Sequence, residues 1–139
     1  MKKLITIIIL ISITTLAPAQ TLMLSVQRSV VKAEMRRVEG FTLTDSLPDF
    51  LQYKRGSQTI AYEFEKVGWW KWICITASIT MPKEDSEAFV LGKLDCNCWK
   101  PTGPNTWLYE TNVFDSPVIV QRTSNNNNTI TFTYKLSKP

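Results

Sequence analysis

The feature that most constrains the fold is a strict alternation of apolar and polar residues near the C-terminus. Over residues 129–136 every second side chain is apolar, from Ile130 to Leu136, and threonine or lysine fills the positions between them. A repeat of two places all the apolar side chains on one face of an extended strand. The four asparagines of residues 125–128 predict a turn, and residues 118–123 predict a second strand before it. We therefore expect a C-terminal β-hairpin.

Further segments have the composition of strands, because β-branched and aromatic side chains fit a pleated surface. Their short connections, which contain glycine and proline, favour antiparallel neighbours. The sequence therefore predicts a mainly β fold, an antiparallel β-sandwich or small β-barrel with a less regular N-terminal segment. The four additional strands are expected at residues 59–67, 69–80, 88–99 (bent at Gly92) and 107–114.

The segment before these strands carries two conflicting patterns. Leu22, Leu24 and Val26 alternate as in a strand, which favours a strand over residues 22–31. The alternative is a helix, since apolar residues also recur at helical spacing up to residue 38 and Gly40 is placed to end it. Residues 41–43 predict a short strand, and residues 45–51 predict a loop or helical turn around Pro48. No internal sequence repeat is apparent.

The N-terminus has the three parts of an export signal. Two lysines precede an uncharged apolar run of residues 4–16, and Ala17-Pro18-Ala19 fits a small-x-small cleavage site. We therefore expect residues 1–19 to be a cleavable signal peptide, residues 20–139 to form a single domain, and the product to be secreted or periplasmic. No second apolar run is long enough to predict a membrane span after cleavage.

Charge and composition exclude several classes of function. Residues 20–139 contain 14 basic and 12 acidic side chains, and the basic residues occur only in pairs such as Arg36-Arg37. Nucleic-acid binding needs a larger positive patch, so it is not predicted. Histidine is absent, which removes Ser-His-Asp and histidine-metal chemistry. The sequence predicts neither a metal site nor a cofactor.

Three cysteines remain, and in an oxidising compartment they predict one disulfide and one free thiol. Cys96 and Cys98 are two residues apart and would share a face of a strand. A bond from Cys74 to either of them would link two neighbouring strands. A direct bond between Cys96 and Cys98 would close a very tight ring and is less favoured, and the spacing does not fix the pairing.

The run Trp69-Trp70-Lys71-Trp72 is the least usual feature of the chain. On a regular strand Trp70 and Trp72 would lie on the same face as Cys74. If that face is open, the two indoles form an aromatic platform that could stack on a sugar ring or a partner protein. The alternative is that both tryptophans fill the core. A β-bulge between residues 72 and 74 would separate Cys74 from the tryptophan face.

These observations support three hypotheses of function. The first is a non-catalytic binding module that engages a protein or glycan through Trp70, Trp72 and Trp99. The second is a carrier that encloses a small apolar ligand in a barrel cavity. Its cavity would be lined by Phe64, Ile75, Phe89 and Phe132.

The third hypothesis is a carboxylate-dependent hydrolase. Glu63 and Glu65 would point to the same side of a strand, as a pair of acid and base requires. The same spacing is also typical of the solvated face of a sheet, and the sequence favours a protein that is not an enzyme.

Overall fold

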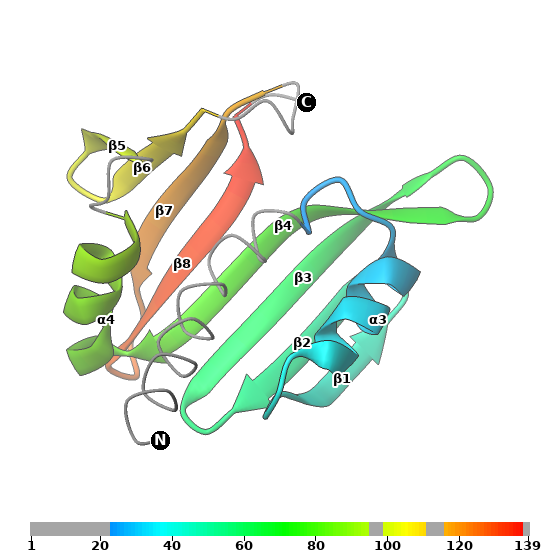
Figure 1. Ribbon diagram of the computed structural model, residues 1–139, viewed down its shortest axis with the longest axis horizontal. Coiled ribbons are helices and arrows are strands. Elements are labelled where there is room, and N and C mark those ends of the chain that lie inside the picture. Colours follow the sequence, from blue (N-terminus) through cyan, green and yellow to red (C-terminus); the bar gives the residue numbers. More distant parts are fainter. Residues whose placement is uncertain (1–22, 95–98, 111–115, 138–139) are drawn as a thin grey trace, which may run out of the picture.

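The computed structural model describes residues 23–94, 99–110 and 116–137 of the chain. The predicted signal peptide lies outside these residues. Within the described residues eight strands form one antiparallel sheet in the order β1-β2-β3-β4-β8-β7-β6-β5, and two helices lie against it (Figure 1). The first half of the chain contributes α3 (Arg28–Arg37), β1 (Thr42–Leu47), β2 (Phe50–Arg55), β3 (Gln58–Val67) and β4 (Lys71–Pro82). The second half contributes α4 (Lys83–Phe89), a π-helical turn (Val90–Leu94), β5 (Lys100–Gly103), β6 (Thr106–Tyr109), β7 (Val118–Ser124) and β8 (Thr129–Leu136).

The two halves follow the same order of elements, a helix and then four strands. In each half the strands form a meander, and the last strands of the two meanders, β4 and β8, pair with each other at the centre of the sheet. The sequence shows no repeat that would announce this arrangement. The two halves therefore repeat a topology and not a sequence. The pairing of β4 with β8 joins them.

One face of the sheet forms the core. A single register row crosses six strands, and every side chain in it is buried. Both helices pack on this face: the Tyr62 hydroxyl donates to the Met35 sulfur on α3 at 3.3 Å, and the Phe89 ring of α4 lies 4.6 Å from that of Phe132. The buried row consists of Leu51, Tyr62, Ala77, Tyr134, Val120 and Trp107.

The neighbouring row points to the other face and is polar or small, as alternation requires. It contains Gln52, Ala61, Ser78, Thr133 and Gln121, none of which is buried. The prediction of a mainly β antiparallel fold is therefore confirmed. The sheet is not closed, and its second layer consists of helices.

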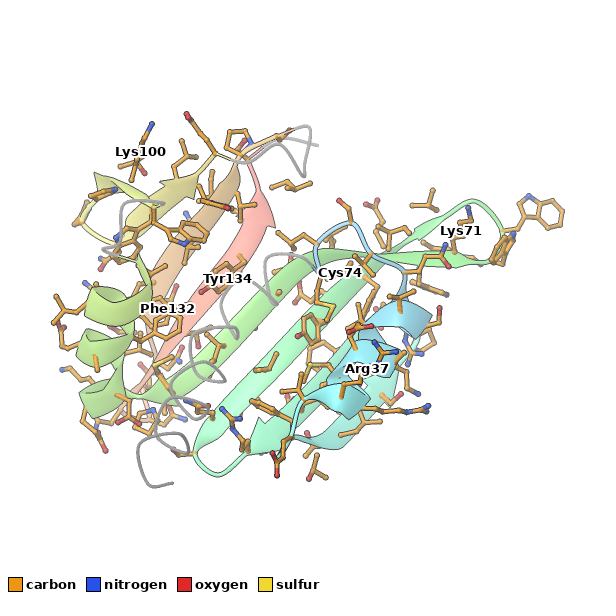
Figure 2. All side chains as sticks on the ribbon, viewed as in Figure 1. Arg37, Lys71, Cys74, Lys100, Phe132 and Tyr134 are labelled. Carbon is orange, nitrogen blue, oxygen red and sulfur yellow. The ribbon has the colours of Figure 1, made fainter. Side chains whose placement is uncertain are left out.

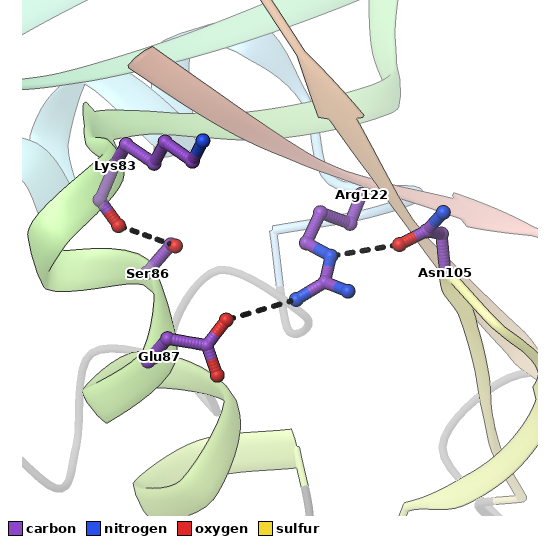
Figure 3. A network of polar contacts seen from close by, with 5 residues as sticks. All are labelled: Lys83, Ser86, Glu87, Asn105 and Arg122. Carbon is purple, nitrogen blue, oxygen red and sulfur yellow. Dashed lines mark hydrogen bonds and ion pairs between the residues drawn. The ribbon is translucent and has the colours of Figure 1, made fainter. Parts of the chain in front are cut away.

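Arg122 on β7 connects α4 to the hairpin of β5 and β6 (Figure 3). Its Nε donates to the Asn105 side chain at 2.8 Å, and its Nη1 lies 3.8 Å from the Glu87 carboxylate. The guanidinium also lies 5.7 Å from the centre of the Trp107 ring. Because a planar guanidinium serves hydrogen bonding and ring contact together, one side chain fixes three elements of the second half.

Three predictions of local structure are wrong. Residues 88–99 were expected to be a strand, but α4 and the π-helical turn occupy residues 83–94. The reason is a helical stripe: Ser86, Val90 and Leu94 recur every four residues, and all three are buried. Residues 28–31, expected as strand, belong to α3, in which Val31 and Met35 are buried at the same spacing. Residues 45–51 were expected to be a loop or helical turn, but β1 extends to Leu47 and β2 begins at Phe50, so β2 was missed.

Candidate binding groove

The hairpin of β3 and β4 extends past the rest of the sheet and carries the tryptophan run (Figure 1). Gly68 makes the turn with a φ of +68°, a conformation that glycine adopts without strain. Trp69 is 93% exposed and Trp70 is 73% exposed, whereas Trp72 is half-buried. The alternative that both Trp70 and Trp72 fill the core therefore does not hold for Trp70.

A bulge in β4 lies at Ile75, so Trp72 and Cys74 stay in regular alternation on one face and the predicted separation of Cys74 from the tryptophan face does not occur. Glu63 pairs with Thr76 and Phe64 pairs with Cys74, so Ile75 has no partner on β3. The extra residue places Cys74 on the core face with Ala77 and leaves Ile75 44% exposed. Figure 2 shows Lys71 on the projecting hairpin and Cys74 further along β4, toward the middle of the sheet.

An open groove of about 470 Å³ lies between α3 and the hairpin. The hairpin contributes Trp70 and Trp72, so the structure brings these two predicted site residues together on one wall. The opposite wall is one side of α3 and the residue before it. This wall consists of Gln27, Arg28, Ser29, Lys32, Ala33 and Arg36.

The helical wall is strongly basic. Arg28, Lys32 and Arg36 follow one another at intervals of four residues, which places them about 6 Å apart along one side of the helix. Within the described residues none of the three has a carboxylate within 4.0 Å. Glu34 on the same helix pairs instead with Arg37, which does not line the groove. The groove is therefore a positively charged site without a built-in counter-charge.

Contacts with the sheet hold part of this basic row in place. The Arg28 guanidinium donates to the Leu47 carbonyl at 3.1 Å and to the Ser46 hydroxyl at 2.9 Å. Both acceptors are neutral, so neither contact is an ion pair. Burial raises the pKa of Tyr53 beneath the helix, and the positive charges of Arg28 and Arg36 act against this rise. The two arginines therefore lie close enough to the same part of β2 to act on it together.

A further cation lies at the aromatic wall. The Lys71 ammonium is 5.2 Å from the centre of the Trp70 ring, within the range of a cation–π contact. The contact covers one face of the indole with positive charge. The aromatic side of the groove therefore adds to its positive potential.

Trp99 lies elsewhere. Its ring is 4.9 Å from that of Tyr109 and 5.9 Å from that of Tyr134, and only 7% of the residue is exposed. Sequence reasoning grouped it with Trp70 and Trp72, but the structure places it in the core of the second half. It does not line the groove.

The cysteines predicted to form a disulfide are only partly described. Cys74 is a buried free thiol, and its Sγ donates to the Thr76 carbonyl at 3.5 Å. Burial raises the pKa of this thiol to about 12. Cys96 and Cys98 lie outside the described residues, so the predicted bond stays a prediction.

The residues of the other two hypotheses do not line the groove. Glu63 and Glu65 are exposed on the face of the sheet opposite the helices. The carrier hypothesis assumed a closed barrel around Phe64, Ile75, Phe89 and Phe132. The sheet is open, Ile75 is exposed, and Phe89 packs directly on Phe132.

Sequence reasoning missed the basic wall. The signal was the spacing of Arg28, Lys32 and Arg36, but it becomes a continuous stripe only once residues 28–36 are assigned to a helix. The apposition of this helix to the hairpin is a long-range contact: Gln27 bridges to Ile73, 46 residues away. No local sequence pattern predicts such a contact.

The described part of the chain contains no group of three metal-binding side chains of the Cys, Asp and Glu types. None of its helices has the length and apolarity needed to cross a membrane. Comparisons with protein families, with curated proteins and with solved structures give no match.

Proposed function

We propose that this chain is an exported, secreted or periplasmic binding module without catalytic function, and that it holds a glycan or a segment of a partner protein in the groove between α3 and the β3–β4 hairpin. One observation carries the proposal: an exposed indole, Trp70, and a half-buried one, Trp72, face a row of cations across an open groove. Exposed tryptophan is costly in water, and it provides a large contact area at a low cost in conformational entropy.

The contrast within the tryptophans supports this assignment. Trp99 and Trp107 are buried and contact other rings, as expected of residues that stabilise the fold. Trp70 is mostly exposed, and among the described residues its ring contacts the Lys71 ammonium. A residue of this size that does little for the core is better explained by a ligand.

The site is tested on an array that displays glycans and peptides side by side. We expect wild-type protein to bind a defined set of ligands, and Trp70→Ala to lose at least tenfold in affinity for them, because aromatic anchors at the centre of a site carry 2 kcal/mol or more. Trp69→Ala is the matched control, since Trp69 is even more exposed and does not line the groove. Equal binding by Trp70→Ala and Trp69→Ala would contradict the proposal.

Export is tested separately by mass spectrometry of the product. We expect a chain that begins at Gln20, recovered from the medium or the periplasm. Recovery of residues 1–19 on a cytoplasmic product would contradict this part of the proposal and leave the groove unaffected.

A further inference from the structure

We infer that the ligand of the α3 groove is a carboxylated glycan. The inference rests on the proposed function and names the chemistry of its ligand. Three observations on the groove support it: the row of unpaired cations, the aromatic wall opposite, and the strand edge beside the groove, which is already occupied.

The row of cations calls for a ligand with repeated negative charge. Arg28, Lys32 and Arg36 extend over about 12 Å of helix, and no carboxylate of the described chain pairs with them. A polymer with an anion on successive units would meet them one after another. The planar fork of arginine matches a carboxylate with two parallel hydrogen bonds, which makes a carboxylate a suitable anion at Arg36. At Arg28 the Nε and Nη2 groups already donate to the Leu47 carbonyl and the Ser46 hydroxyl, so this residue contributes mainly its charge.

The aromatic wall of the groove favours a ligand that also has a flat apolar surface. Sugar rings present such a surface through their C–H groups, and an indole stacks against it over a large area. The Lys71 ammonium, 5.2 Å from the Trp70 ring centre, would lie beside any acid group of a stacked sugar. A uronic acid combines a ring that stacks with a carboxylate that pairs.

The occupied strand edge argues against an acidic peptide. Peptides are commonly recognised by adding a strand to a free sheet edge. Beside the groove the edge of β4 is already paired, because Ser25 donates its amide to the Cys74 carbonyl at 2.7 Å and Cys74 donates to the Val26 carbonyl at 2.8 Å. A peptide in the groove would form no backbone hydrogen bonds with β4 here. Any ligand must therefore be recognised by the side chains of the groove alone. Such recognition suits a glycan.

The test measures binding of the purified protein to polygalacturonate by titration calorimetry. The matched probe is the same polymer with its carboxylates methyl-esterified, which keeps the sugar rings and removes the charge. We expect polygalacturonate to bind at least tenfold more tightly than the ester. We also expect the difference to shrink as sodium chloride is raised, because salt screens exposed charges.

Two double variants locate the charges that matter. Lys32→Gln with Arg36→Gln should weaken binding of polygalacturonate about tenfold, since it removes two charge-assisted contacts. Arg37→Gln with Lys54→Gln removes the same charge outside the groove and should leave binding unchanged. Glutamine has a helix propensity close to that of lysine and arginine, so circular dichroism should show α3 intact.

Each remaining outcome overturns a distinct part of the inference. Equal binding of polygalacturonate and its ester, still lost in Trp70→Ala, would overturn the carboxylate and leave the proposed function standing. Poly-L-glutamate that binds as tightly as polygalacturonate would overturn the glycan. If both double variants weaken binding equally, the polymer is attracted by the net charge of the protein, and the groove is not the site of recognition. If the wild-type protein does not bind polygalacturonate at all, the whole inference is wrong.

Discussion

At the scale of single residues, the core contains the thiol of Cys74 and the phenols of Tyr62 and Tyr134, whose pKa values are raised by burial. Burial raises the pKa of the Cys74 thiol from 9.0 to about 12; a hydrogen bond with the Thr76 backbone lowers it in part, and the Glu63 carboxylate raises it further. Burial raises the pKa of Tyr62, with smaller contributions from Cys74 and Tyr53, and burial raises that of Tyr134. All three groups therefore hold their protons to higher pH in the folded chain than in the unfolded chain.

We expect the reduced protein to lose stability as the pH rises above 9. The unfolded chain then releases a proton from Cys74 that the folded chain keeps, so deprotonation favours unfolding. With a shift from 9.0 to about 12, the thiol alone accounts for about 2 kcal/mol at pH 10.5. Urea unfolding at pH 7 and 10.5 measures the loss, and Cys74→Ala should remove about that part of it. A Cys74→Ala variant with the same pH dependence as the wild type would refute this assignment.

At the scale of elements, the sequence was informative where alternation or composition was typical of a strand. The strands β3 and β8 alternate between apolar and polar side chains, whereas β4 and β7 are rich in β-branched residues, and all four were predicted near their observed positions. β2 was missed because Phe50 is apolar on the face opposite Leu51 and Tyr53, which breaks the alternation in a strand of six residues. In α4 the run of apolar residues from Ala88 to Leu91 concealed the helical spacing that burial reveals.

Only one of the two walls of the candidate groove could be predicted from the sequence. The exposed hairpin wall could be proposed from Trp70 and Trp72, because clustered tryptophans are unusual in any strand. The helical wall could not, since residues 28–31 support a strand equally well and only the packing of Val31 and Met35 on the sheet decides for a helix. Trp99 was wrongly assigned to the binding site, because composition does not distinguish an exposed aromatic surface from a buried aromatic core.

Gly68 and Gly92 differ in the backbone conformation that their positions require. Gly68 turns the tryptophan hairpin at a φ of +68°, whereas Gly92 lies in the π-helical turn without a positive φ. An added Cβ would meet no atom within 4 Å at either position, so the backbone alone decides the effect.

We therefore expect Gly68→Ala to lower the free energy of unfolding by about 1 kcal/mol, since alanine is strained in the left-handed region. Gly92→Ala should raise it by roughly 0.5 kcal/mol, because alanine loses less entropy in a helical conformation. Urea unfolding of both variants measures the two signs. Changes of the same sign would show that backbone conformation is not the deciding factor.

At the scale of the whole molecule, the question is whether the two halves fold as one unit. Each half has its own helix and its own meander of four strands, but the buried face runs without interruption from β2 through β4 and β8 to β6. Neither half has a second layer of sheet, so each depends on the other to complete one continuous core. We infer a single cooperative unit.

Phe132 on β8 tests that inference. Its side chain is fully buried, contacts Phe89 on α4 and Trp107 on β6, and lies opposite Ile79 on β4 (Figure 2). We expect Phe132→Ala to lower the free energy of unfolding by about 3–5 kcal/mol, the usual result of removing a buried ring. In a single unit, hydrogen exchange at the amides of α3 should accelerate by the same free energy, although α3 lies in the other half.

The control is Leu91→Ala, a change of an apolar side chain in the same half that is 70% exposed. It should change stability by no more than about 0.5 kcal/mol. Urea unfolding followed by circular dichroism and by tryptophan fluorescence should give one coincident transition for both variants. Acceleration in Phe132→Ala confined to α4 and β5–β8, with α3 still protected as in the wild type, would mean that β4 and β8 join two independently stable halves, and the continuous core would then not be the source of cooperativity.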